Sequence, residues 1–330
     1  MSTNAVEVHD LAKAYGKLRA VDGITFEVDA GEMFGFLGPN GAGKTTTISM
    51  LCTLVKPTSG SAIVAGRDVV SERERVRKNI GLVFQDPTLD ELLTAEQNLR
   101  FHGVLYGLGR AHLKDRMTKV LKMVELESRR GDLVRTFSGG MRRRLEIARG
   151  LMHSPRVLFL DEPTVGLDPQ TRLHIWDYID ELSRTEDITI FLTTHYLEEA
   201  ERCSRIAIID AGKIVAIDTP AALKASVGED CVTLQTEDDP ESWRQIKERL
   251  GVEAALEGDR LTCMVPDGEA FIPRLIEALD IGVRSISTRK PTLDDVFVKY
   301  TGRAIRDADA DSTQINRDNP WIRSTTRRSA

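Results

Sequence analysis

Short apolar runs alternate with stretches of helical periodicity through about the first 225 residues of the chain. Strands buried on both faces of a parallel sheet appear as nearly continuous apolar runs, and VLFL at 157–160 and ITIFLTT at 188–194 fit that description. The alternation predicts an α/β fold. The predicted strands are Val6–His9, Ile24–Val28, Met33–Leu37, Ser61–Ala65, Ile80–Phe84, Val157–Leu160, Ile188–Thr193, Arg205–Ile209 and Lys213–Ile217, the last two joined as a hairpin.

Strand patterns disappear between the fifth and sixth predicted strands, and helical periodicity dominates there. Thr94 and Gln97 form a T-x-x-Q capping box that opens a helix over Asn98–Tyr106. A second helix is predicted over Leu113–Val124. We therefore predict a helical subdomain at about residues 86–150, inserted into the α/β core.

A different pattern begins near residue 228, where strand, helix, two strands, helix and strand follow one another as in a small βαββαβ unit. These segments are Cys231–Gln235, Glu241–Leu250, Val252–Leu256, Arg260–Val265, Glu269–Leu279 and Gly282–Thr288. The predicted domains are 1–227, a small α+β domain at 228–302, and a polar, flexible tail at 303–330. Trp321 in that tail is either a docking anchor or incidental.

Composition changes this picture little. The chain has 330 residues, which suits two domains, and a net charge of −6, which argues against a general nucleic-acid binder. Its four cysteines lack metal-ligand spacing. We find no signal-peptide pattern and no uninterrupted apolar window of the ~18 residues that a membrane span needs. We therefore expect a soluble, cytoplasmic chain without a nucleic-acid partner, whose membrane role would come through another protein.

The sequence GPNGAGKT follows one predicted strand and precedes a helical pattern, which is the context that a phosphate-binding P-loop requires. Glycines let the backbone turn its N–H groups inward, and the helix N-terminus favours negative charge. Lys44 is expected to reach the β- and γ-phosphates, and the Thr45 hydroxyl to bind Mg²⁺. The predicted nucleotide-binding residues in this segment are Gly38, Asn40, Gly41, Ala42, Gly43, Lys44, Thr45 and Thr46.

A second acidic element completes the chemistry expected of a nucleotide hydrolase. In VLFLDE, a buried strand delivers Asp161 to its end, where the carboxylate can hold Mg²⁺ through water. Glu162 follows at once and is placed to polarise an attacking water.

The segment FSGGMRRRLEIARGL narrows the class. Ser138, Gly139 and Gly140 open a helix whose free N–H groups form a second anion site. The arginines at 142–144 read as a solvated or phosphate-facing helix side. With this segment the chain resembles the ATP-binding subunits of ABC transporters, although Phe137 and Met141 stand where that family's LSGGQ signature has Leu and Gln.

The resemblance implies a fold, a substrate and a partner. It implies an α/β P-loop ABC ATPase core with antiparallel β and helical subdomains, followed here by the small α+β C-terminal domain. It also implies that ATP is hydrolysed with Mg²⁺, and that the signature closes over the γ-phosphate held by a second ATP-binding subunit. All catalytic elements are intact in this sequence, so a homodimer is the simplest arrangement.

Four further residues match family positions one by one. The resemblance implies that Gln85 touches Mg²⁺ or the attacking water, and that His195 contacts the γ-phosphate. It implies that Asp168 belongs to the D-loop crossing the dimer interface, and that Tyr15 stacks on adenine. It also makes residues 86–93, with three leucines in an acidic loop, the expected docking surface for a membrane subunit, although those leucines could equally belong to the core.

The end of the C-terminal domain, PTLDDVFVKYTGR, resembles the end motif of daunorubicin-resistance-type ATP-binding subunits. That implies an exporter with an ABC-2 type permease on a separate chain, a hydrophobic drug, lipid or polyketide as cargo, and a peripheral position on the cytoplasmic face of the membrane. Physically, the motif predicts a helix started by Pro291 with Leu293, Val296, Phe297 and Tyr300 on one face. Alternatives are a polysaccharide-exporting ABC ATPase and a soluble, non-transport ABC ATPase.

Overall fold

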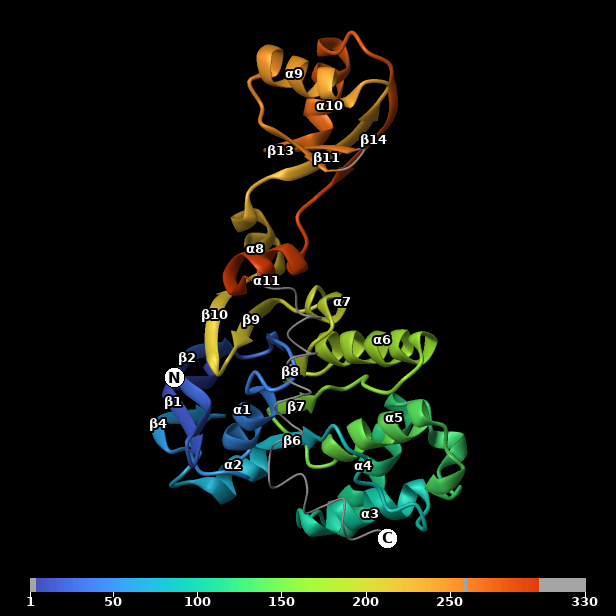
Figure 1. Cartoon of the computed structure of the whole chain (residues 1–330). Coiled ribbons are helices and arrows are strands. Elements are labelled where there is room, and N and C mark those ends of the chain that lie inside the picture. The colour runs from blue at the N-terminus through green and yellow to red at the C-terminus, as the bar shows by residue number, and fades with distance from the viewer. Residues whose placement is uncertain (1–3, 258–259, 303–330) are drawn as a thin grey trace, which may run out of the picture. The chain divides into compact units, whose positions relative to one another are not determined.

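The structure is a computed structural model that describes residues 4–257 and 260–302. These divide into two compact units, residues 4–219 and 220–302, each with its own sheet and core. Figure 1 shows the order of elements along the chain. The predicted tail at 303–330, with Trp321, lies outside the described residues.

A six-stranded sheet forms the centre of the first unit, in the order β10-β9-β3-β8-β7-β6. Its strands are β3 (Met33–Leu37), β6 (Ile80–Val83), β7 (Val157–Asp161), β8 (Thr189–Thr194), β9 (Arg205–Asp210) and β10 (Lys213–Asp218). Strands β9, β3, β8, β7 and β6 pair in parallel, and β10 is the antiparallel edge. The predicted β9–β10 hairpin is confirmed, because Ala211 and Gly212 both adopt left-handed conformations with φ of 47° and 79°.

A second, antiparallel sheet packs over this centre, in the order β2-β1-β4-β5. Its strands are β1 (Asn4–Tyr15), β2 (Leu18–Asp29), β4 (Ser59–Val64) and β5 (Arg67–Asp68). β1 and β2 are longer than predicted, since a two-residue turn pairs Tyr15 with Leu18 and carries the ladder through polar positions. The core includes an aromatic cluster in which the Phe191 ring lies 5.6 Å from both Phe34 and Phe36.

The helices of the first unit begin where capping residues satisfy their free N–H groups. The Thr94–Gln97 capping box is confirmed, but its helix starts directly after Thr94, earlier than predicted. The helices are α1 (Lys44–Leu51), α2 (Arg73–Asn79), α3 (Ala95–Leu105), α4 (Arg110–Met123), α5 (Gly139–Gly150), α6 (Pro169–Thr185) and α7 (Leu197–Ala200), with 3₁₀ turns η1 (Glu127–Arg129) and η2 (Val134–Thr136). Helices α3, α4 and α5 contact one another as a helical layer (Figure 1).

The second unit has the βαββαβ order predicted for it. Its elements are α8 (Pro220–Val227), β11 (Asp230–Thr236), α9 (Asp239–Leu250), β12 (Ala254–Glu257), β13 (Arg260–Val265), α10 (Gly268–Ala278), β14 (Val283–Arg289) and α11 (Leu293–Thr301). The sheet is antiparallel in the order β12-β13-β11-β14, and α9 and α10 cover its core side. Helix α8, predicted as part of the first domain, contacts α11 in this unit.

The C-terminal helix corrects one expectation. Its first residue is Leu293 rather than Pro291, because Thr292 and Asp295 form a capping box that fixes the start. Leu293, Val296 and Phe297 are buried, and Tyr300, which the same i, i+3, i+4, i+7 spacing places on their side of the helix, is 42% exposed.

In residues 4–257 and 260–302, no helix is both long and apolar enough to cross a membrane. The four cysteines are free thiols, and three of them are buried.

The aromatic cluster gives a stability prediction. Phe191→Ala removes a fully buried ring that packs against four other phenylalanines, so the free energy of unfolding of this unit should fall by about 3–5 kcal/mol. Denaturant unfolding measures this change. The matched control is Phe101→Ala, whose side chain is 69% exposed and should change stability by less than about 0.5 kcal/mol. Equal losses in both variants would contradict the described core.

Candidate nucleotide site

The loop of residues 38–43 connects the buried strand β3 to α1 at the carboxyl edge of the parallel sheet. Two of its glycines are required by space. A Cβ atom at Gly38 would lie 2.3 Å from the Ile209 carbonyl oxygen, and one at Gly43, where φ is 109°, would lie 2.5 Å from that of Ala20. Only glycine permits this close wrapping, which directs the loop around the first turn of α1.

Lys44, the first residue of α1, carries a buried charge. Its side chain is 4% exposed, and Nζ donates hydrogen bonds to the carbonyl oxygens of Gly38 (2.7 Å) and Pro39 (3.1 Å). A carboxylate oxygen of Glu162 lies 3.2 Å from the same Nζ. The ammonium is therefore held inside the loop, as a buried cation must be paired and hydrogen-bonded.

Glu162 lies between two basic groups directly after β7. Its second carboxylate oxygen is 3.2 Å from Nδ1 of His195, which follows β8. Burial alone would raise the pKa of Glu162, but His195 and Lys44 outweigh it and hold that pKa below its usual range. The carboxylate thus stays ionised near neutral pH, as a group that polarises water requires. Glu162 also has φ of +46°, a left-handed conformation that costs a non-glycine residue about 1–3 kcal/mol.

Asp161 and Thr45 form the oxygen-rich side of the site. The Thr45 hydroxyl donates to Asp161 Oδ1 (3.3 Å), and the Thr193 hydroxyl donates to the same oxygen (2.6 Å). Burial raises the pKa of Asp161, against the hydrogen bonds from both threonines. A hydroxyl and a carboxylate are donors that Mg²⁺ prefers, and it commonly binds one or two carboxylates together with substrate phosphates. The Thr45 hydroxyl and the Asp161 carboxylate, 3.3 Å apart, offer oxygen donors of this kind.

Three residues contribute to the site in ways that the sequence did not indicate. Thr193 Oγ1 accepts from the Glu162 backbone N–H (3.0 Å) while donating to Asp161, so it links the two acidic residues. Glu199, 2% exposed, accepts from the Thr194 hydroxyl (2.6 Å) and from the Thr164 hydroxyl, which ties the start of the His195 loop to the segment after Glu162. The third is Arg143, the middle of three arginines, which is 6% exposed rather than solvated or phosphate-facing as predicted.

The remaining predicted residues make local contacts. Ser138 caps α5 by accepting from Met141 N–H (3.3 Å), and Asp168 caps α6 by accepting from Thr171 N–H (3.0 Å). Gln85 is exposed shortly after β6. Tyr15 is 50% exposed, with Lys13 Nζ 5.0 Å from its ring centroid. The structure therefore brings together Lys44, Thr45, Asp161, Glu162 and His195, whereas Tyr15, Gln85, Ser138 and Asp168 are exposed.

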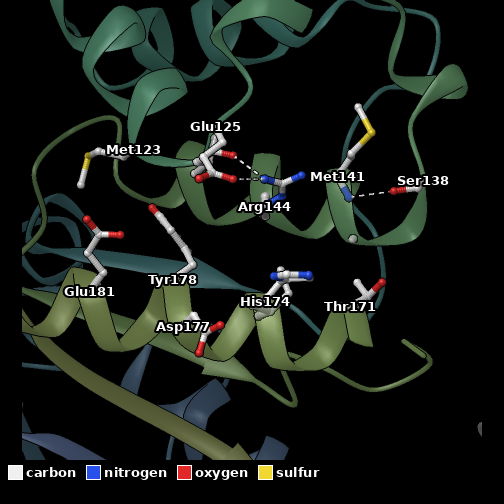
Figure 2. Close-up of a pocket in the computed structure, with 13 residues that line it drawn as sticks. Met123, Glu125, Ser138, Met141, Arg144, Thr171, His174, Asp177, Tyr178 and Glu181 are labelled. Atoms are coloured by element: carbon white, nitrogen blue, oxygen red, sulfur yellow. Dashed lines mark hydrogen bonds and ion pairs between the residues drawn. The ribbon is translucent and has the colours of Figure 1, made fainter. Parts of the chain in front are cut away.

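A cavity of about 420 Å³ lies between α5 and α6, and Ser138 is among the residues that line it (Figure 2). The Arg144–Glu125 ion pair (3.2 Å) forms one wall, and Tyr178 reaches into it from α6. No P-loop residue lines this cavity, so it is distinct from the cluster around Lys44. Burial raises the pKa of Tyr178 well above its usual range.

Comparison with known proteins places this geometry in a family. The family described as ABC transporter matches residues 21–165, and the family described as "ATP-binding protein DrrA1-3-like, C-terminal domain" matches residues 219–301. The daunorubicin/doxorubicin resistance ATP-binding protein DrrA of Streptomyces peucetius is 41% identical over 313 residues, covering 92% of this chain and 94% of the relative. The chain belongs to the ABC transporter family of ATP-binding proteins. It is therefore an ATPase of the ABC type, and the family resemblance and fold predicted from its motifs are confirmed.

Other ABC proteins extend the comparison. The linearmycin resistance ATP-binding protein LnrL of Bacillus subtilis is 37% identical, covering 92% of this chain and all of the relative. Among solved structures, cbiO1 from Clostridium perfringens, described as part of the ABC transporter complex cbiONQ, has a TM-score of 0.64 at 27% identity, over 76% of this chain and 97% of that one. The ATP-binding cassette MJ0796, in a dimeric post-hydrolysis state with ADP and Pi, has a TM-score of 0.59 at 27% identity, over 65% of this chain and 98% of that one.

Lys44→Ala tests the P-loop of this ABC subunit. Because Lys44 places the loop's only buried ammonium where phosphates would bind, its removal should abolish tight nucleotide binding. Titration with a fluorescent ATP analogue measures the dissociation constant. Lys78→Ala, which removes an exposed lysine on α2, should leave that constant unchanged. Tight binding retained by the Lys44 variant would refute the assignment.

Proposed function

We propose that this ABC ATPase energises an exporter, in partnership with an ABC-2 type membrane permease on a separate chain, at the cytoplasmic face of the membrane. The cargo is a hydrophobic drug, lipid or polyketide. The observation that carries the proposal is the match along nearly the whole length, including the C-terminal unit, to ATP-binding proteins named for daunorubicin, doxorubicin and linearmycin resistance and for Nod factor export.

The βαββαβ order of the second unit argues against one alternative. A polysaccharide-exporting ABC ATPase would be expected to carry a β-sandwich at its C-terminus. Here α9 and α10 connect the strands of a single antiparallel sheet.

The side chains around Lys44 support a mechanism for hydrolysis. Lys44 and the loop N–H groups would bind the phosphates, and Thr45 and Asp161 would hold Mg²⁺, which when bound would neutralise charge on the phosphate oxygens. Glu162 orients the attacking water and accepts hydrogen bonds from it, since its carboxylate is ionised and held between Lys44 and His195. As the family resemblance implies, His195 would contact the γ-phosphate, and Gln85 would touch Mg²⁺ or the attacking water.

The Ser138–Gly140 turn would complete the site of a second subunit. Ser138 and Gly139 are exposed, and the N-terminal N–H groups of α5 form an anion site of the kind that a γ-phosphate needs. Two copies would then enclose two ATP molecules. The dimeric post-hydrolysis state of the cassette MJ0796, which resembles this chain, supports the arrangement.

Glu162→Gln tests both the mechanism and the dimer. The amide keeps the shape of the side chain but cannot polarise water as a carboxylate does, so kcat should fall by at least about 100-fold. The variant should also accumulate as an ATP-bound dimer, detectable by size-exclusion chromatography with light scattering. Glu198→Gln, which alters an exposed neighbour on α7, should keep the wild-type rate and monomer fraction. A wild-type rate in the Glu162 variant would refute the role of this residue.

An apolar surface suits the docking of the permease. Phe101, Val104 and Leu105 have side chains 69%, 60% and 69% exposed, and their i, i+3, i+4 spacing places them on one face of α3. Leu92, in the loop before α3, is 75% exposed. Phe101, Val104 and Leu105 form the α3 patch, and Leu92 is one of the three leucines that the sequence placed in the docking loop. Exposed apolar groups gathered in this way mark interaction sites.

Leu105→Asp tests this surface. The charge should disrupt an apolar contact, so co-purification of a co-expressed, genetically adjacent six-span permease should be largely lost. ATPase activity of the isolated subunit should stay within about twofold, because the residue is exposed and distant in sequence from every predicted site residue. Leu173→Asp, at an exposed leucine on α6 (56%), is the matched control and should retain the permease. Ribosomes or DNA in the eluate instead of the permease would refute the export proposal.

A further inference from the structure

The three consecutive arginines on α5 differ in their environments. Arg142 pairs with Glu91 (2.8 Å) and Arg144 with Glu125 (3.2 Å), both partly exposed. Arg143 between them is buried, with a side chain 7% exposed. A buried guanidinium needs a partner for each of its N–H groups, so its contacts identify what it holds.

The Arg143 guanidinium contacts the backbone around Glu162 at the nucleotide site, and it also contacts Phe84 and Glu146. Nε donates to the carbonyl oxygen of Pro163 (2.6 Å), and Nη2 donates to those of Asp161 (3.1 Å) and Glu162 (3.2 Å). Nη1 donates to the Phe84 carbonyl oxygen (2.5 Å) and to Glu146 Oε2 (3.0 Å). These five hydrogen bonds match the five N–H donors of an arginine. Three consecutive carbonyl groups around Glu162 thus converge on one side chain.

Glu146 extends this contact to the segment that contains Gln85. Its Oε1 accepts from the Thr88 backbone N–H (2.8 Å), while its Oε2 binds Arg143. The Arg143–Glu146 pair therefore contacts both ends of residues 84–88, with Gln85 between them. Burial lowers the pKa of Arg143, but Glu146 opposes the shift, and an arginine stays charged at neutral pH.

The backbone of Glu162 needs external support. Its left-handed φ of +46° is unfavourable for a residue with a Cβ, and such conformations persist only where the surroundings fix them. The carbonyl groups of residues 161–163 set that conformation, and Arg143 binds all three. We infer that Arg143 is a positioning residue, which holds the Glu162 carboxylate in its reactive orientation and joins it to the Gln85 segment and to helix α5.

A lysine cannot replace this geometry. Its single ammonium is compact and has three donors, whereas the planar guanidinium reaches carbonyl groups on two separate segments at once. Lysine keeps the charge and the pairing with Glu146, so Arg143→Lys removes the planar fork while leaving the buried carboxylate compensated. This makes it the most selective variant for the test.

The inference rests on the role proposed for Glu162, so both residues are tested together. Arg143→Lys should lower kcat for ATP hydrolysis by roughly 10–100-fold, because small displacements of a reacting group cost that much. The dissociation constant for a fluorescent ATP analogue should change by less than about threefold, since Lys44 and its loop are untouched. Arg144→Lys, which changes a neighbouring arginine with no contact to residues 161–163, should keep the wild-type kcat.

A double variant separates positioning from simple loss of stability. If Arg143 acts through Glu162, adding Arg143→Lys to Glu162→Gln should lower kcat no further than Glu162→Gln alone. Multiplied effects, or a kcat for Arg143→Lys equal to wild type, would overturn the inference. A parallel loss of nucleotide binding and melting temperature in Arg143→Lys would also overturn it, by making the role structural. If Glu162→Gln itself hydrolyses ATP at the wild-type rate, the proposed role of Glu162 fails instead.

Discussion

The burial of one positive charge organises the nucleotide site. Lys44 lies almost wholly inside the protein, and a buried ammonium is tolerated only with hydrogen bonds and an opposite charge. The loop carbonyl groups provide the first and Glu162 the second, while Nδ1 of His195 lies 3.2 Å from the other carboxylate oxygen. These groups come from different segments of the chain, and they meet because β3, β8 and β7 are parallel neighbours whose carboxyl ends share one edge. The sheet order is thus what allows the charges to compensate one another.

Much of the fold follows from short-range signals in the sequence. Buried parallel strands are continuous apolar runs, so the bounds of β3, β7 and β8 could be predicted to within one residue. The Thr94–Gln97 capping box indicated where α3 begins. Strands β1 and β2 were underestimated because their exposed positions are polar and their length depends on pairing with each other. Arg143 was misjudged although Gly140 and Ile147, three and four residues away on the same helix face, are both buried. The three arginines were treated as one exposed group, although helical periodicity places Arg143 on the buried face of α5.

The two units of the chain differ in what their strands and helices hold in place. In the first unit, strand ends and loops surround the nucleotide site, and the backbone of Glu162 at that site is strained. The second is a compact sheet with two covering helices, and its strand order places β11 between β13 and β14, as in other split βαβ arrangements. Its final helix is fixed by the Thr292–Asp295 box, and an ion pair from Arg289 holds the pKa of Asp295 down at about 2. The two family matches fall one on each unit, consistent with separate modules.

Helix α5 is supported unequally on its two sides. On one side Arg143 makes five hydrogen bonds to residues at or beside the nucleotide site. On the other side, toward α6, lies a hollow of about 420 Å³, many times the ~30 Å³ that one water occupies in the liquid. At one end of this hollow Gly140 approaches Thr171 so tightly that a Cβ would lie 2.4 Å from its methyl group. A shift of α5 into the hollow would displace solvent, but it would also pull the buried Arg143 guanidinium away from its acceptors. The position of the helix, and of the serine turn at its tip, therefore depends on the hydrogen bonds of one arginine where side-chain packing is missing.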